Sequence, residues 1–245
     1  MTFAIGATLN AGGILLGAFF GLALRRPMSS PAQLMLRNVL GALALLVGFW
    51  LVWLGINGPF PSCVGQFFIA LLAVVLGNLL GKVLALQKMS NRLGREAAGL
   101  IAAAQKGSAQ KALAGFNACT ILFCVAPLGI IGAIDDGVSG FYWLLAVKAV
   151  MDAMAMTTFV KMFRWPVVLS AIPVFLWLSL VTLACRLYIT PLLQSPALAD
   201  SLIVASGLVT FAIAIVIFEV RKVELANYLP ALALAPLLTW LFKTI

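Results

Sequence analysis

The sequence predicts an all-α integral membrane protein with seven or eight transmembrane helices, eight being the favoured number. Hydrophobic residues make up 64% of the 245 residues and charged residues only 9%, whereas a soluble domain is about half apolar and a quarter charged. The mean hydropathy of +1.14 comes from apolar runs of about twenty residues, the length that crosses a bilayer. We therefore expect the whole chain, 1–245, to form a single membrane domain.

Eight apolar runs account for most of the chain. Their approximate bounds are 3–24, 39–56, 67–86, 117–134, 141–163, 167–188, 202–218 and 229–242. The last run is the weakest candidate, because it is short and contains Pro230 and Pro236.

Glycines at regular spacing predict close packing between these helices. Gly13, Gly17 and Gly21 repeat every four residues in the first run, so they lie on one helix face. The second run has a glycine at every seventh position from 41 to 55. Faces of small residues let membrane helices approach each other closely. They are candidates for packing within the chain or for contacts in a homo-oligomer.

Proline predicts at least one broken helix. Pro127 lies in the middle of the fourth run, where it removes a backbone donor and clashes with the preceding turn. Pro173 is expected to interrupt the sixth run. Asp135 and Asp136 follow the fourth run directly, at the outer end of the broken helix. They either attract a cation to a mouth there or are solvated loop charges.

The basic residues predict the orientation in the membrane. The connections after the first, third, fifth and seventh runs hold Arg25, Arg26, Arg37, Lys82, Lys88, Arg92, Arg95, Lys106, Lys111, Lys161, Arg164, Arg221 and Lys222. Positively charged connections stay on the cytoplasmic side of a membrane. We therefore expect a bacterial inner-membrane protein with both termini on the non-cytoplasmic side.

The longest polar stretch, residues 87–115, lies in one of these cytoplasmic connections. Its lysines and arginines are interleaved with apolar residues such as Leu93, Ala97 and Ile101. This pattern indicates a short helix lying on anionic lipid headgroups. A mobile basic loop is the alternative.

Two parts of the sequence resemble each other. Asn117 is followed by Ala126-Pro127-Leu128, and Asn227 by Ala235-Pro236-Leu237, at corresponding places in two four-span halves. Proline-interrupted segments at matching positions are typical of transporter sites. The alternative to a parallel 4+4 repeat is chance, because these residue types are common in the chain.

Lys148 and Asp152 are the best candidate site residues. They lie four residues apart, on one helix face, in the middle of the fifth apolar run. Asp152 falls close to the bilayer midplane, where a charged group costs roughly 2.5–3.5 kcal/mol unless it faces a partner or water. Lysine before aspartate is the less favourable order within a helix, so we expect partners on other helices, first of all Asn10 and Asn117.

Catalytic and metal-binding signatures are missing from the sequence. The chain has no histidine, the commonest proton shuttle and a common metal ligand. Hydrolase, metalloprotease and nucleotide-binding motifs are also absent. The positive charge lies in membrane-flanking connections, which does not suggest nucleic acid. We expect no enzyme activity, no catalytic residues, no cofactor and no metal.

Three segments carry a resemblance to a known family. They are Thr120-Ile-Leu-Phe-Cys-Val-Ala-Pro-Leu-Gly-Ile-Ile-Gly-Ala-Ile-Asp-Asp-Gly137 with Lys148-Ala-Val-Met-Asp152, Gly6-Ala-Thr-Leu-Asn10, and Asn227-Tyr-Leu-Pro-Ala-Leu-Ala-Leu-Ala-Pro236. Together they resemble the bacterial membrane family called domain of unknown function 554. Pro127 departs from the family pattern, which would make the break specific to this chain. The resemblance implies a multi-span inner-membrane protein and no particular activity.

Two functions fit these observations. The first is a transporter or permease for a small solute or ion, in which Asp152 and Lys148 bind or couple and Asp135, Asp136, Asn10 and Asn117 contribute. The second is a membrane scaffold that transports nothing, in which the pair only joins helices and glycine-rich faces bind partner helices.

Overall fold

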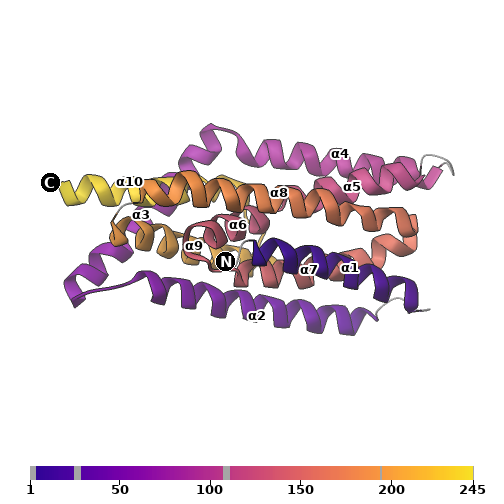
Figure 1. The fold of residues 1–245 in the computed structure, drawn as a ribbon, viewed down its shortest axis with the longest axis horizontal. Helices are drawn as coiled ribbons and strands as arrows, with labels where there is room; N and C mark the ends of the chain where they lie inside the picture. The colour runs from indigo at the N-terminus through magenta and orange to yellow at the C-terminus, as the bar shows by residue number, and fades with distance from the viewer. Residues whose placement is uncertain (1–3, 25–28, 107–110, 194, 245) are drawn as a thin grey trace. The chain divides into compact units, whose positions relative to one another are not determined.

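The chain folds into helices joined by short connections (Figure 1). The computed structural model describes residues 4–24, 29–106, 111–193 and 195–244, and this part contains no strand. The α-helices are α1 (Ile5–Ala23), α2 (Ser30–Gly55), α3 (Phe60–Val83), α4 (Leu86–Lys106), α5 (Lys111–Val125), α6 (Pro127–Ser139), α7 (Trp143–Phe163), α8 (Ala171–Ala184), α9 (Pro196–Ile217) and α10 (Ala231–Thr244). Shorter helical turns are η1 (Trp165–Ser170), η2 (Cys185–Ile189), η3 (Thr190–Leu192) and η4 (Leu225–Tyr228).

The predicted number of spans is confirmed. Seven helical segments of the described chain are long and apolar enough to cross a membrane, and α5 with α6 makes an eighth if the two count as one span. The two helices bend by 55° at the break before Pro127. We call residues 125–127 the elbow. The predicted proline-broken helix is therefore present.

Several predicted boundaries were wrong. The helices α2 and α3 begin at Ser30 and Phe60, well before the first residues of the apolar runs. Proline fits the first turn of a helix, where its missing N–H is not needed, and Pro61 lies there in α3. Pro173 likewise lies in the first turn of α8 and does not interrupt that helix.

The longer α2 also changes the place of one basic residue. Arg37, predicted in a connection, lies inside α2 and forms an ion pair with Glu219. Two other predicted loop charges, Arg25 and Arg26, lie outside the described residues. The stretch 87–115 is helical over Leu86–Lys106, while its residues 107–110 lie outside the described part. Its place at the membrane surface stays a prediction.

The chain forms two compact units. The first consists of Met1–Leu34, Met89–Asp136 and Tyr142–Leu183, and the second of Met35–Lys88, Gly137–Phe141 and Ala184–Ile245. Each unit takes segments from both halves of the sequence. The units therefore do not coincide with the four-span halves of the predicted repeat, which stays a prediction.

The core of the first unit is apolar and helical. Buried side chains from α1, α5, α7, η1 and α8 pack together, among them Ile14, Phe123, Phe163, Val174 and Leu178. Burying each large aliphatic or aromatic side chain away from water is worth about 1.5–3 kcal/mol. In a membrane this gain is smaller, because lipid is also apolar, and close packing matters more.

The second unit uses glycines for close packing. A Cβ on Gly81 of α3 would overlap the backbone of Asn227 in η4, and one on Gly77 would come within 2.5 Å of the Ala231 backbone in α10. On α2, Gly48 packs against Gly207 of α9. The predicted glycine-rich helix packing is thus present in this unit.

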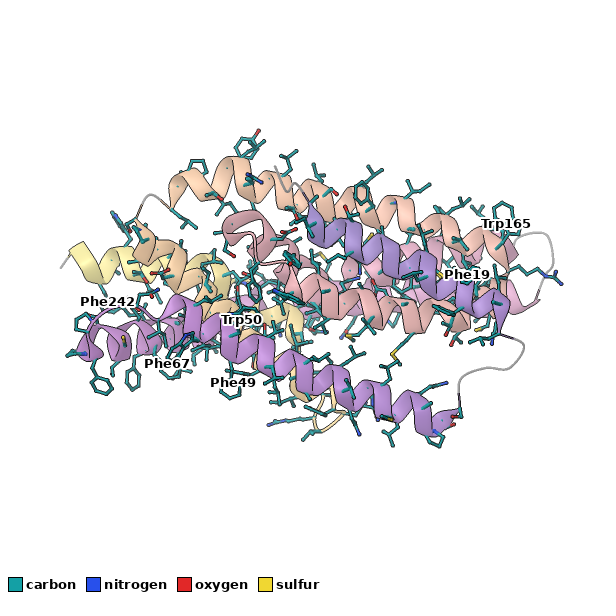
Figure 2. All side chains as sticks on the ribbon, turned by 60° about the horizontal axis from the view of Figure 1, so that its bottom comes forward. Phe19, Phe49, Trp50, Phe67, Trp165 and Phe242 are labelled. Atoms are coloured by element: carbon teal, nitrogen blue, oxygen red, sulfur yellow. The ribbon has the colours of Figure 1, made fainter. Side chains whose placement is uncertain are left out.

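Large apolar side chains cover the outside of the helices. Figure 2 shows Phe49 and Trp165 extending away from the ribbon, and these two and Phe19 are each more than 60% exposed. A soluble protein rarely exposes apolar surface on this scale. These faces are suited to contact with lipid chains.

The number of crossings can be tested with reporters at the two termini. If α5 and α6 together cross once, the chain makes eight crossings and both termini lie on the same side, which the basic residues predict to be the non-cytoplasmic one. We expect phosphatase fusions, which are active only outside the cytoplasm, to be active at both ends. A fluorescent protein placed between α4 and α5 should fluoresce, because the positive charges predict that this connection lies in the cytoplasm. Termini on opposite sides would show that the bent pair re-enters the membrane without crossing it.

Candidate functional site

The candidate site is built on the contact between α1 and α7, which lie side by side (Figure 1). A Cβ on Gly13 would come within 2.5 Å of the Ala149 carbonyl oxygen, and one on Gly17 would overlap the Ala153 carbonyl. Gly21 makes the same kind of approach to α7 one turn later. We call this contact the α1–α7 seam. Only glycine allows two helix backbones to come this close.

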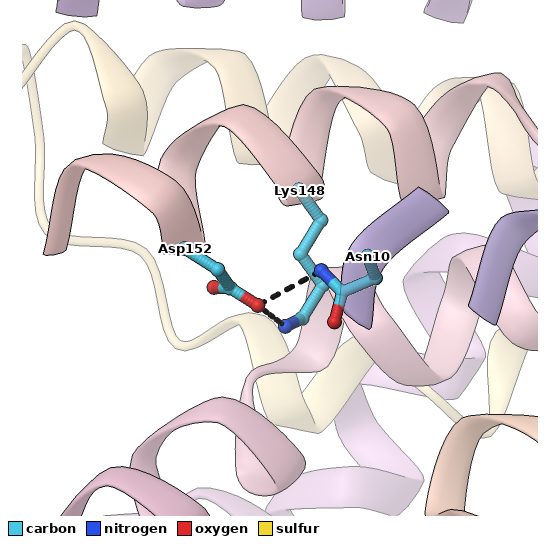
Figure 3. A network of polar contacts seen from close by, with 3 residues as sticks. All are labelled: Asn10, Lys148 and Asp152. Carbon is cyan, nitrogen blue, oxygen red and sulfur yellow. Dashed lines mark hydrogen bonds and ion pairs between the residues drawn. The ribbon is translucent and has the colours of Figure 1, made fainter. Parts of the chain in front are cut away.

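The seam places Asn10 against the predicted ion pair (Figure 3). Asn10 lies three residues before Gly13, on the same side of α1. Its Nδ2 donates a hydrogen bond of 2.9 Å to Asp152 Oδ2. The Lys148 ammonium forms an ion pair with the same carboxylate oxygen. Asn10 of α1 and Lys148 of α7 therefore bind the same atom, Asp152 Oδ2.

The pair is enclosed by protein. Lys148 is 1% exposed, Asp152 is 7% exposed and Asn10 is fully buried. A lysine ammonium and a carboxylate lose much of their hydration at such a site, and their mutual attraction only roughly offsets that cost. The two charges are therefore held by their partners and not by solvent.

A glycine just after the elbow makes room for Lys148. A Cβ on Gly129, two residues after Pro127, would lie 2.7 Å from Lys148 Cε, so the lysine stem passes over that glycine. The ammonium lies 5.8 Å from the centre of the Phe123 ring, within range of a cation–π interaction. Residues of α5 and α6 on both sides of the elbow therefore contact the lysine.

Several buried polar side-chain atoms of the first unit have no hydrogen-bond partner among the described residues. One is Asn10 Oδ1, on the amide that binds Asp152. Two more are the hydroxyl oxygens of Thr120 and Thr182. Thr120 lies one turn before Phe123 on α5, and Thr182 one turn after the buried Leu178 on α8, so each shares a face with a core residue. Buried polar atoms are usually paired, so this group is exceptional.

Asp135 and Asp136 are not loop charges. Both lie inside α6, which continues to Ser139, and both are buried. The Gly6 N–H donates a hydrogen bond of 3.2 Å to Asp136 Oδ2. A carboxylate at this position also complements the positive end of the α1 dipole. The interpretation as solvated charges was wrong, because the helix extends past the apolar run that was used to place its end.

The two predicted asparagine partners differ in position. Asn10 makes the contact with Asp152 that was expected. Asn117 is half-buried on α5, and the hydrogen bonds that Asp152 accepts in the described structure come from Lys148 and Asn10. Whether these residues bind a solute stays a prediction. The contacts of Lys148 with Phe123 and Gly129 were missed, although a glycine soon after a mid-helix proline was a usable signal.

The fold and the enclosed ion pair define a helical membrane protein that crosses the bilayer several times and carries opposite charges inside one unit. The family described as "Protein of unknown function (DUF554)" matches residues 5–240, and the chain belongs to that family. This confirms the resemblance found in the sequence.

Two relatives extend over nearly the whole chain. The uncharacterized protein YqgA of Escherichia coli (strain K12) is 27% identical over 232 residues, which cover 94% of each chain. The uncharacterized membrane protein YdfK of Bacillus subtilis (strain 168) is 21% identical over 94% of this chain and 93% of its own length. No solved structure matches the chain.

The seam can be tested with one pair of substitutions on α1. Gly17→Ala forces a Cβ into the Ala153 carbonyl, whereas a Cβ on Gly12 meets no atom within 4 Å. We expect Gly17→Ala to lower stability by on the order of 1–3 kcal/mol, the usual cost of overpacking. Gly12→Ala should leave stability unchanged or raise it slightly, because alanine favours helix. Thermal unfolding in detergent measures both, and equal effects would contradict the close contact.

Proposed function

We propose that the protein is a secondary transporter or ion-coupled permease for a small solute or ion, with Asp152, Lys148 and Asn10 at its binding or coupling site. One observation carries the proposal. A pair of opposite charges lies enclosed within the membrane-spanning part of the first unit, beside an amide oxygen, Asn10 Oδ1, that has no hydrogen-bond partner among the described residues.

Stability alone is a weak reason for this arrangement. Replacing a buried ion pair by apolar side chains of similar volume is often neutral or stabilising. The α1–α7 seam is already held by backbone contacts at Gly13 and Gly17, so the helices do not need the charges to meet. Ionisable groups inside a membrane are commonly part of an ion or substrate pathway.

The pair supplies a simple exchange mechanism. In the empty state the Lys148 ammonium neutralises Asp152. A cation or proton that binds the carboxylate competes with that ammonium, and Asn10 Oδ1 offers a further oxygen ligand for a cation. Release of Lys148 changes its contacts with Gly129 and Phe123, which lie on the two helices joined at the elbow. Ion binding is thereby coupled to the bend between α5 and α6.

The proposal includes a place and an orientation for the protein. It lies in the bacterial inner membrane with both termini on the non-cytoplasmic side, as the loop charges predict. Asp136, which accepts a hydrogen bond from Gly6 at the start of α1, then lies towards the outer side of Asp152. A movement of α6 would be transmitted to α1 through the hydrogen bond between Gly6 and Asp136.

A membrane scaffold is the second candidate. The observation that favours it is the enclosure of the pair, since Lys148 is 1% exposed. In a scaffold the pair joins helices permanently, and exposed faces of the chain bind partner helices or a second copy. The two functions differ in what happens when the charges are removed together.

The test compares wild type with Asp152→Asn and with the charge-free double variant Lys148→Met/Asp152→Asn. The single variant leaves the lysine without its counter-ion, at a cost of about 3–5 kcal/mol, and the double variant should recover most of that loss. Thermal unfolding of purified protein is measured with single probes: alkali and divalent cations, small carboxylates, amines and amino acids, at several pH values. Probes that stabilise are then followed by uptake into proteoliposomes.

If the protein is a transporter, we expect at least one probe to stabilise the wild type. The same probe should stabilise the control Asp200→Asn, which removes a carboxylate of the second unit, and should fail to stabilise either variant that lacks Asp152. Uptake of that probe should be lost in the folded double variant. If the double variant binds and moves every probe as wild type does, the pair is structural and the transport proposal is wrong.

A further inference from the structure

A cavity of about 440 Å³ lies in the first unit, between α4 and the elbow. It is separate from the Lys148–Asp152 pair, neither of which lines it. Its α4 wall includes Ser90, Asn91 and Arg95, and its opposite wall includes Leu122, Val125 and Pro127. The volume is within the range of about 300–1,000 Å³ typical of small-molecule sites.

The two walls differ in chemistry. The α4 wall offers a guanidinium, an amide and a hydroxyl, all of which can donate hydrogen bonds to an anion. Arginine is especially suited to phosphate, because its planar fork can make two parallel hydrogen bonds. The opposite wall is aliphatic. A ligand that satisfies both walls has an anionic phosphate at one end and an apolar part at the other.

The surroundings favour a lipid over a soluble phosphate compound. The helix α4 is amphipathic: Ala97 is fully buried and Ile101 packs against the core of the first unit, while Arg92 and Arg95 are exposed. Basic amphipathic helices of this kind bind anionic membrane surfaces. The aliphatic wall belongs to the bent pair α5–α6, which is apolar enough to enter a membrane and so to meet lipid chains.

We infer that this cavity binds the headgroup of an anionic phospholipid, with Arg95 contacting the phosphate and the upper part of an acyl chain lying on Leu122 and Val125. The inference does not depend on transport. All three residues of the elbow line the cavity, and Gly129, two residues further on, contacts Lys148. Lipid binding therefore stabilises the bend and with it the position of the lysine.

The experiment uses purified full-length protein in detergent micelles with added phosphatidylglycerol or phosphatidylcholine of identical acyl chains. Bound lipids are counted by native mass spectrometry, and stability is followed by thermal unfolding. The variants are Arg95→Gln and, as the matched control, Arg92→Gln. Arg92 is exposed on the same helix and does not line the cavity. Arg95→Lys keeps the positive charge but lacks the planar guanidinium. It replaces Arg95→Gln in the experiment if that variant does not fold.

We expect phosphatidylglycerol to bind wild type and Arg92→Gln more tightly than phosphatidylcholine and to raise their unfolding temperatures. Loss of a charge-assisted hydrogen bond should weaken that binding about tenfold in Arg95→Gln. Equal binding of the two lipids, or equal losses in both arginine variants, would overturn the inference. Glycerol phosphate is the further probe. If it stabilises the protein through Arg95 as well as the lipid does, the site binds a soluble phosphate compound and the lipid assignment is wrong.

Discussion

The approach of α1 to α7 at Gly13 and Gly17 is the contact on which the candidate site depends. Any residue larger than glycine at these positions would separate the two backbones and move Asn10 away from Asp152. The same contact brings the start of α1 to Asp136, through the Gly6 N–H. Helix packing by small residues is ordinary in membrane proteins. Here it also sets the distance between a buried amide and a buried carboxylate.

The second unit has a similar glycine contact beside a different asparagine. Gly81 lies against Asn227 there, but both ends of that amide are occupied: Oδ1 accepts a hydrogen bond of 3.0 Å from the Gln87 N–H, and Nδ2 donates one of 2.8 Å to Glu224. Asn227 thus behaves as a structural asparagine. Asn10 has only its Nδ2 bonded among the described residues. The difference supports a binding role for Asn10, because a purely structural network is normally fully paired.

Much of the fold was predictable, and the reasons are physical. Apolar runs identify spans because each must cover the same hydrocarbon thickness, and Pro127 identified the break because it lacks an N–H. Helix ends were less predictable: α2 begins at Ser30 and α6 continues past Asp136, although both residues lie outside the apolar runs. The Lys148–Asp152 pair was inferred from the spacing of the two residues on a helix, and its contact with Asn10 from the free-energy cost of an unpartnered charge inside a membrane. The Gly129 and Phe123 contacts were not, since they depend on how the elbow turns, which local sequence does not determine.

The central claim is that Asp152 can be reached by water-borne ions, and chemical modification of the wild-type protein tests it most directly. Sealed vesicles of both orientations are treated with a membrane-impermeant carbodiimide and an amine, and modified carboxylates are located by mass spectrometry. Glu96, exposed on α4, serves as the positive control. The proposal predicts modification of Asp152 from at least one side, reduced by any ion or solute that stabilises the protein. Vesicles in which Glu96 reacts and Asp152 reacts from neither side would contradict it.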